Sequence, residues 1–356
     1  MPTGNPLEKL AETVRAVYRN QPEVREDCWP PVKKTRYINL AMLENERLGF
    51  RSDLARYTVR GSVDDIIKGK TVVSYSHIFE KVTSGSRILL EGRPGSGKTT
   101  LMNKISRDWA NGEILNELVS VLISVQLRQL SSETTVALDA ILSIFSPRAE
   151  VDEYEREIRK SNGEGVCFAL DGLDEYSNTN LRSDFIHELI RGTKLPNSVV
   201  IDASRPAASC KFRRVAAQNI EVLGFLKPQI EEFVSDYYDK DEQKAQAFKA
   251  YLGDHQNVLH MCYLPIHAAI VTFLFGVMGS NLPETETEIY YEFTLQTLIR
   301  TLQKSGRDLD ADVNLERFED LGKEKRCIFL NICKLALSAT EEKQGFIHKE
   351  VKHFPP

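Results

Sequence analysis

The sequence predicts an α/β fold in which a parallel β-sheet is covered by helices. Apolar runs rich in β-branched residues recur along the first two thirds of the chain, which is typical of buried strands. Stretches with helical spacing of apolar residues separate these runs. Strands that alternate with helices in this way form parallel sheets through right-handed crossover connections.

The first predicted strand runs directly into a glycine-rich loop. Residues Arg87 to Thr100 read RILLEGRPGSGKTT, which contains the pattern GxxxxGK[ST]. The glycines let the backbone curl so that successive N–H groups point at phosphate oxygens. We expect Lys98 to reach the β- and γ-phosphates of a nucleoside triphosphate and the Thr99 hydroxyl to bind Mg²⁺. The residues predicted to hold the nucleotide here are Gly92, Arg93, Pro94, Gly95, Ser96, Gly97, Lys98, Thr99 and Thr100.

A helix is predicted to follow this loop, because residues Thr99 to Asn111 carry apolar side chains at helical spacing. The positive end of its dipole would face the bound anion.

A second strand ends in acids. Residues Val166 to Glu175 read VCFALDGLDE, an apolar run followed by three carboxylates. The carboxyl ends of strands in open α/β sheets are where nucleotide ligands bind. Asp171 is predicted to hold Mg²⁺ together with Thr99. Glu175 is the first candidate and Asp174 the second for orienting or deprotonating the water that attacks the γ-phosphate.

Two further strands complete the predicted sheet. Residues Leu118 to Leu130 read LVSVLISVQLRQL, and residues Asn197 to Arg205 read NSVVIDASR. Arg205, at the end of the latter strand, could reach the γ-phosphate and report its presence. Its position is equally compatible with a surface residue or with a salt bridge.

The segments GRPGSGKTT, FALDGLDE and DASRPA together resemble the NACHT family of signal-transducing P-loop NTPases, which includes the NOD-like receptors. Beyond the sheet, LGFLKPQIEEFVSDYY looks like the family's exit into a small helical domain. The segment VLHMCYLPIHAAI is similar to its Cys-x-x-Pro helix, and this resemblance assigns Pro265 a contact with adenine. NLPETETEIYYEFTLQTLIR looks like the start of the family's winged-helix domain.

The resemblance implies four regions along the chain. They are an N-terminal linker or helical segment (1–56), a P-loop NACHT nucleotide-binding domain (57–222), a helical domain (223–280) and a partial winged-helix domain (281–356). The winged-helix domain of the family carries a histidine that contacts the β-phosphate of ADP. Neither His348 nor His353 matches that motif, so the role is not assigned, and the resemblance implies a truncated nucleotide-binding core.

The composition of the chain narrows the classes of protein to which it can belong. It has 356 residues, 42% of them hydrophobic, and a net charge of −5, which disfavours nucleic acid as a partner. Six scattered cysteines without a CxxC pair favour reduced thiols, and we expect a cytoplasmic protein without a signal peptide. Residues Met261 to Gly279 lack charged side chains, but Pro265, His267 and two glycines favour a buried helix, with Pro265 in its first turn, over a membrane span.

By this resemblance the chain is an ATP/ADP-binding switch with slow, Mg²⁺-dependent ATP hydrolysis. It would assemble with like subunits when activated and signal through an unknown adaptor or effector, in innate immunity or cell death. Two alternatives remain open: an AAA+-like ATPase whose turnover a client stimulates, and a scaffold that nucleotide only stabilises. ATP is favoured over GTP, because no strand carries the NKxD pattern of GTPases.

Overall fold

A computed structural model describes residues 5–21, 30, 36–44, 67, 71–130, 137–176, 184–239 and 241–304. The chain divides into two compact units, Met1–Glu284 and Thr285–Pro356. Helix α14 (Glu286–Lys304) is the described part of the second unit. His348, His353 and most of the predicted winged-helix domain lie outside the described residues. The predicted boundaries after residues 56, 222 and 280 remain predictions.

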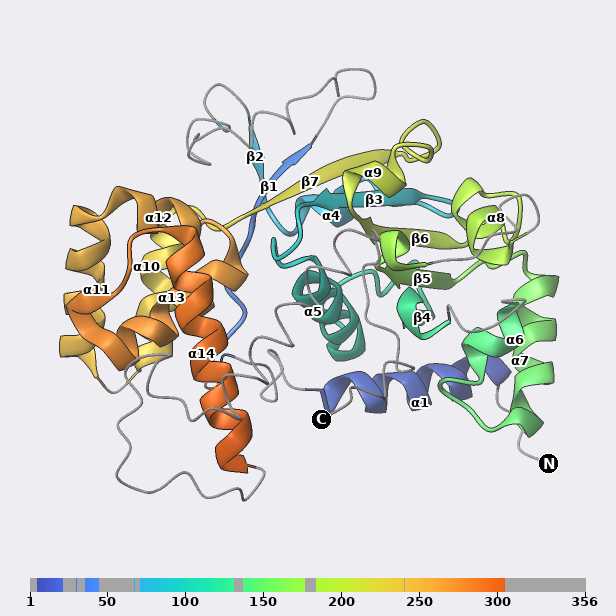
Figure 1. Ribbon diagram of the computed structural model, residues 1–356. Coiled ribbons are helices and arrows are strands. Elements are labelled where there is room, and N and C mark those ends of the chain that lie inside the picture. The colour runs from blue at the N-terminus through green and yellow to red at the C-terminus, as the bar shows by residue number, and fades with distance from the viewer. Residues whose placement is uncertain are drawn as a thin grey trace, which may run out of the picture. The chain divides into compact units, whose positions relative to one another are not determined.

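A seven-stranded sheet forms the centre of the first unit, with the strand order β2-β1-β7-β3-β6-β5-β4 (Figure 1). The run from β7 to β4 is parallel, whereas β1 pairs antiparallel with β7 and β2. The strands are β1 (Ala41–Glu44), β2 (Val72–Val73), β3 (Arg87–Gly92), β4 (Val121–Gln126), β5 (Val166–Asp171), β6 (Val199–Ser204) and β7 (Gln218–Gly224). The four predicted strands are all present, and the α/β class is confirmed.

Strand β7 and the antiparallel edge β1–β2 are missing from the sequence prediction. All seven residues of β7 are buried, although Gln218, Asn219 and Glu221 are polar, so its sequence lacks the apolar run of a central strand. Strand β6 lies between β3 and β5, which separates the strand before the glycine-rich loop from the strand that ends in acids.

Helix α5 (Lys98–Asn111) covers one face of the sheet, and α1 (Pro6–Arg19) packs against it (Figure 1). The Arg19 side chain donates hydrogen bonds to the carbonyl oxygen of Ala110, near the C-terminus of α5. The buried Tyr18 hydroxyl donates to Leu122 O at 3.3 Å and accepts from Ser124 N at 2.7 Å on β4. These bonds make the N-terminal helix part of the sheet-containing unit. Helix α7 (Arg148–Lys160) packs against α1 and against α6 (Leu138–Leu142). Helix α8 (Phe185–Arg191) contacts β6, and α9 (Pro206–Ser209) contacts β3.

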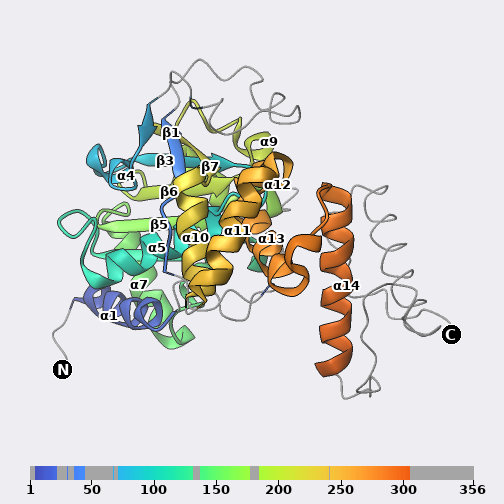
Figure 2. The ribbon, with the colours of Figure 1, turned by 90° about the vertical axis from the view of Figure 1, so that its left-hand side faces the viewer.

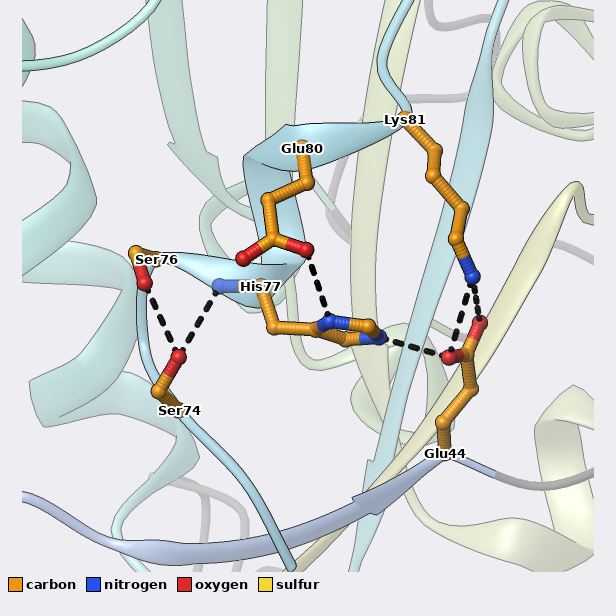
Figure 3. Close-up of polar contacts among 6 residues, drawn as sticks. All are labelled: Glu44, Ser74, Ser76, His77, Glu80 and Lys81. Carbon is orange, nitrogen blue, oxygen red and sulfur yellow. Dashed lines mark hydrogen bonds and ion pairs between the residues drawn. The ribbon is translucent and has the colours of Figure 1, made fainter.

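The antiparallel edge is attached to helix α4 (His77–Glu80) by charged side chains (Figure 3). Nε2 of His77 lies 2.6 Å from a carboxylate oxygen of Glu44, and Nδ1 lies 3.1 Å from Glu80. The hydrogen bond from His77 and the charge of Lys81 lower the pKa of Glu44. These contacts connect the end of β1 to α4.

In the described part of the first unit, β7 is followed by the helices α10 (Lys227–Tyr238), α11 (Glu242–Asp254), α12 (Gln256–Cys262) and α13 (Pro265–Met278) (Figure 2). The rings of Phe248 and Phe275 lie 4.6 Å apart in their aromatic core. The predicted buried helix with Pro265 in its first turn is confirmed as α13. No single helix within the described residues is long and apolar enough to cross a membrane. Residues Pro265–Asn281, which comprise α13 and the turn η3 (Gly279–Asn281), reach the required length and apolar composition only when they are counted together with Glu286–Thr297 as a bent pair.

The end of β7 makes a close backbone contact with these helices, which leads to a prediction. The Phe225 amide donates to Tyr263 O at 2.8 Å, and a Cβ atom at Gly224 would lie 2.3 Å from that same oxygen. We expect Gly224→Ala to lower the free energy of unfolding by about 1–3 kcal/mol, because backbone must shift to admit the methyl group. Gly253→Ala is the control: no atom lies within 4 Å of its Cβ position on α11, so a gain of about 0.5–1 kcal/mol is expected from helix propensity. Urea unfolding measures both, and equal effects would contradict the prediction.

Candidate functional site

A cavity of about 380 Å³ lies at the carboxyl ends of the parallel strands. This volume is within the usual range of about 300–1,000 Å³ for small-molecule sites. One end is polar and is formed by the glycine-rich loop and the residues that follow β4, β5 and β6. The other end is largely apolar and is formed by residues 36–40 and by helices α10 and α13. Among the predicted site residues, Pro94, Gly95, Gly97, Lys98, Thr99, Thr100, Asp171, Asp174, Glu175, Arg205 and Pro265 line this cavity.

Two glycines of the loop make room for other segments as well as for a curled backbone. Gly95 and Gly97 have φ angles of +76° and +97°, which residues with a side chain rarely adopt. A Cβ atom at Gly95 would lie 2.2 Å from Cγ2 of Ile266 on α13, and one at Gly97 would lie 2.9 Å from Leu40. The loop therefore lies in direct contact with the segment before β1 and with the first turn of α13.

Lys98 begins helix α5 directly after the loop. Its ammonium group donates to the carbonyl oxygens of Gly92 at 2.8 Å and Arg93 at 3.0 Å. Burial lowers the pKa of Lys98, while the nearby carboxylates of Asp174 and Asp171 oppose this shift. An anion bound in the loop would act in the same direction as these carboxylates.

The two predicted metal ligands lie side by side. Thr99 and Asp171, which ends β5, both line the cavity. Burial raises the pKa of Asp171, and hydrogen bonding by the nearby Thr99 hydroxyl and the charge of Lys98 offset part of that shift. Within the described ranges, no cluster of three or more His, Cys, Asp or Glu side chains could hold a metal. A magnesium ion here would therefore need oxygens from a nucleotide and from water besides these two residues.

The turn after β5 brings Asp174 and Glu175 to the cavity, and Arg205, which directly follows β6, also lines it. Asp174 and Glu175 belong to the 3₁₀ turn η2 (Leu173–Glu175). Nε of Arg205 lies 2.7 Å from Oδ2 of Asp174, and the Arg205 amide donates to Oδ1 at 3.1 Å. Of the alternatives left open by the sequence, the salt bridge is present, and the half-exposed Arg205 side chain also lines the cavity.

Several lining residues were not identified from the sequence. At the apolar end, Pro265 is joined by Ile266 and Ala269 of α13, Phe225 and Phe233, and by Tyr37, Ile38 and Leu40 from the segment before β1. No motif marks that segment, which lies some 50 residues before the glycine-rich loop. At the polar end, Arg128 donates to Gln126 at 3.0 Å. Both follow or end β4, so the rule that ligands bind at the carboxyl ends of strands could have found them.

Residues 36–40, which precede β1, contact both α10 and α5. Arg36 forms ion pairs with Glu232 at 2.9 Å and Asp236 at 3.0 Å, both on α10. The Lys104 ammonium on α5 lies 5.0 Å from the ring centre of Tyr37, within the range of a cation–π interaction. This segment therefore connects the helix that follows the glycine-rich loop to the helices after β7.

A buried acid lies close behind the site. Asp202, in the middle of β6, is 2% exposed, and neither carboxylate oxygen has a hydrogen-bond partner among the described residues. Burial raises the pKa of Asp202 well above its usual value, and the charges of Asp171 and Asp174 raise it further. A protonated Asp202 removes one negative charge from a region that already holds several carboxylates.

Comparison with known proteins identifies the domain that carries this site. Residues 86–241 match the family model described as the NACHT domain. Over 238 residues the chain is 27% identical to NACHT, LRR and PYD domains-containing protein 3 of Mus musculus, covering 60% of this chain and 22% of that protein. It is 26% identical over 204 residues to NACHT, LRR and PYD domains-containing protein 12 of Homo sapiens, covering 52% of this chain and 19% of that protein. It is 25% identical over 240 residues to Protein NLRC5 of Ictalurus punctatus, covering 58% of this chain and 14% of that protein.

The buried acid predicts a pH-dependent stability. Because the folded-state pKa of Asp202 lies above its unfolded value, the folded protein holds an extra proton, and stability is lost as the pH rises toward the folded pKa. Asp202→Asn removes this dependence. We expect the variant to gain stability over the wild type between pH 5 and pH 8, by about 1.4 kcal/mol for each pH unit over which the wild type keeps its proton. Urea unfolding of both proteins at pH 5 and at pH 8 measures this effect. Asp152→Asn, at an exposed position of α7, is the control. If the free energies of unfolding of wild type and Asp202→Asn differed by the same amount at the two pH values, the prediction would be contradicted.

Proposed function

We propose that this chain, whose residues 86–241 match the model of the NACHT domain, a nucleotide-binding P-loop NTPase module, is an ATP- and ADP-binding molecular switch with slow ATP hydrolysis. One cavity joins the glycine-rich loop to the first turn of α13, and this arrangement supports the proposal most directly. A nucleotide in the cavity contacts both, so nucleotides that differ in their phosphates can favour different arrangements of the two.

The residues fit a nucleotide bound with Mg²⁺. The loop carries no side chain at Gly95 or Gly97 and places Lys98 at the start of α5. The Ser96 hydroxyl is buried without a hydrogen-bond partner among the described residues, but Ser96 itself does not line the cavity. Thr99 and Asp171 supply two adjacent oxygens for the ion, and the apolar end, with Pro265, accommodates a base. When bound, ATP supplies a γ-phosphoryl group that can be transferred to water.

Two residues of the turn η2 (Leu173–Glu175), which we name the acid turn, are assigned different roles in this proposal. Glu175 lines the cavity, where its carboxylate could orient or deprotonate the attacking water. Asp174 instead holds Arg205. A γ-phosphate near Lys98 would compete with Asp174 for the Arg205 guanidinium, and this competition would distinguish ATP from ADP.

The relatives supply the biological context of the proposal. The chain spans about a fifth of the length of these curated relatives, so the activity of a whole receptor is inferred from its nucleotide-binding part. We infer a cytoplasmic signalling protein of the NOD-like receptor type, acting in innate immunity or cell death. Exchange of ADP for ATP would permit self-assembly and recruitment of an adaptor or effector protein.

The nucleotide content of the purified protein tests the proposal. We expect co-purified ADP in the wild type and none in Lys98→Ala, because loss of the charged donor removes about 1.5–3 kcal/mol of phosphate binding. Lys160→Ala, an exposed residue of α7 that does not line the cavity, should retain ADP. Glu175→Gln should bind ATP as the wild type does but fail to hydrolyse it. Chromatography of the denatured protein reads out each variant, and equal nucleotide affinity in wild type and Lys98→Ala would refute the site.

The role of Arg205 gives a separate prediction. Arg205→Gln should weaken ATP binding by about 10- to 150-fold, the equivalent of one hydrogen bond to a charged group, while ADP affinity changes little. Arg159→Gln is the matched control, because Arg159 is also about half exposed and also pairs with a carboxylate, that of Glu155. Isothermal titration with ADP and with a non-hydrolysable ATP analogue measures the ratio. Equal losses for both nucleotides would show that Arg205 does not sense the γ-phosphate.

A further inference from the structure

A buried chain of polar side chains lies directly behind the acid turn. Tyr176 follows Glu175 in the sequence, and its ring is buried. Its hydroxyl donates to Oδ1 of Asp184 at 2.6 Å. Asp184 is the N-cap residue of α8 and is only 4% exposed. The end of the acid turn is thus attached to the start of α8.

Asp184 is held as an anion by several donors. Its Oδ2 atom accepts from the His187 amide at 3.2 Å and from Nδ1 of His187 at 2.8 Å. Burial by itself would raise the pKa of Asp184, but the hydrogen bonds from His187 and Tyr176 outweigh it and lower the pKa. A buried carboxylate with this many donors has a fixed position, because movement would leave one of them unpaired.

The chain continues to the segment that carries Arg205. Because Nδ1 of His187 donates to Asp184, its Nε2 atom accepts, and the Lys211 ammonium lies 3.2 Å from it. The His187 ring, 3% exposed, stacks on Phe212 with ring centres 5.6 Å apart. Lys211 is exposed and lies six residues after Arg205 in the sequence. The series Tyr176–Asp184–His187–Lys211, which we name the buried relay, therefore connects the segments that follow β5 and β6.

The buried relay holds Tyr176, the residue that directly follows the turn η2. On its other side, η2 is held by β5 and by the bond from the Glu175 amide to Gly172 O at 2.9 Å. Glu175 lies between these two attachments. We propose that Tyr176 is a positioning residue, whose hydroxyl, held by Asp184 and His187, keeps the Glu175 carboxylate directed into the cavity for ATP hydrolysis. This inference rests on the proposed function, since it requires Glu175 to act on the attacking water.

Loss of the hydroxyl should alter the rate of hydrolysis rather than nucleotide affinity. Tyr176→Phe keeps the buried ring and removes the hydroxyl that donates to Asp184. A misplacement of about 1 Å in a reacting group costs about 100-fold in rate, so we expect single-turnover ATP hydrolysis to fall about 10- to 100-fold. Dissociation constants for ATP and ADP should stay within about 3-fold, because Tyr176 is not among the described residues that line the cavity.

The matched control is Tyr154→Phe. Tyr154 is also buried, and its hydroxyl also donates to a carboxylate, that of Glu150 at 2.7 Å, but it lies on α7 and does not line the cavity. It should lose similar stability in urea unfolding without any change in hydrolysis. If Tyr176→Phe folds poorly, Lys211→Ala at the exposed end of the buried relay replaces it, with hydrolysis slower by about 3- to 10-fold and nucleotide affinity unchanged.

A double variant shows whether Tyr176 acts through Glu175. If it does, adding Tyr176→Phe to Glu175→Gln leaves the residual rate unchanged. A further 10-fold fall would overturn the inference, as would equal hydrolysis rates in wild type, Tyr176→Phe and Lys211→Ala. A wild-type protein that binds no ATP or does not hydrolyse it would overturn the proposed function, and this inference with it. Hydrolysis that is normal in the wild type and unaffected by these variants would overturn the inference alone.

Discussion

The contact between the glycine-rich loop and two distant segments is the constraint on which the rest of the site depends. The spaces beside Gly95 and Gly97 are occupied by Ile266 and Leu40. The Ile266 amide also approaches Gly95 O at 3.4 Å. Glycine at these positions thus serves two purposes: it frees the backbone to surround phosphate, and it admits the neighbouring segments. Any nucleotide that reshapes the loop must act on α13, because close-packed groups do not deform continuously.

The distribution of charge around the cavity follows from the same arrangement. Parallel strands bring Asp171, Asp174 and Glu175 to one edge of the sheet, where Lys98 and Arg205 also line the cavity. Arg205 is paired with Asp174, and Lys98 donates to two carbonyl oxygens of the loop. Protonation of the buried Asp202 limits the repulsion among the acids. A bound phosphate would find both cations already at the cavity, each held by a partner that it can replace.

The sequence predicted those parts of the site whose chemistry lies in one continuous segment. The glycine-rich loop, the acids after β5 and Arg205 after β6 each follow a strand that reads as apolar, so both strand and side chain were identified. The apolar end of the cavity could not be found in this way, because Tyr37, Phe225 and Ile266 meet only in the folded chain. Strand β7 was missed for a related reason: its buried Gln218, Asn219 and Glu221 have a polar pattern that only tertiary contacts make compatible with a central strand.

The segment after β6 holds the acid turn at two points, and in the proposed function this would separate γ-phosphate sensing from catalysis. Arg205 binds Asp174 directly, whereas Lys211 reaches Tyr176 through His187 and Asp184. If the Arg205 guanidinium turned from Asp174 toward a γ-phosphate, the turn would lose that ion pair but keep the bond from the Arg205 amide to Asp174 and the attachment at Tyr176. Glu175 lies between Asp174 and Tyr176, so both bonds that remain are at its neighbours in the sequence. Recognition of the γ-phosphate and the alignment of Glu175 can then occur together, because they depend on different bonds of the same turn.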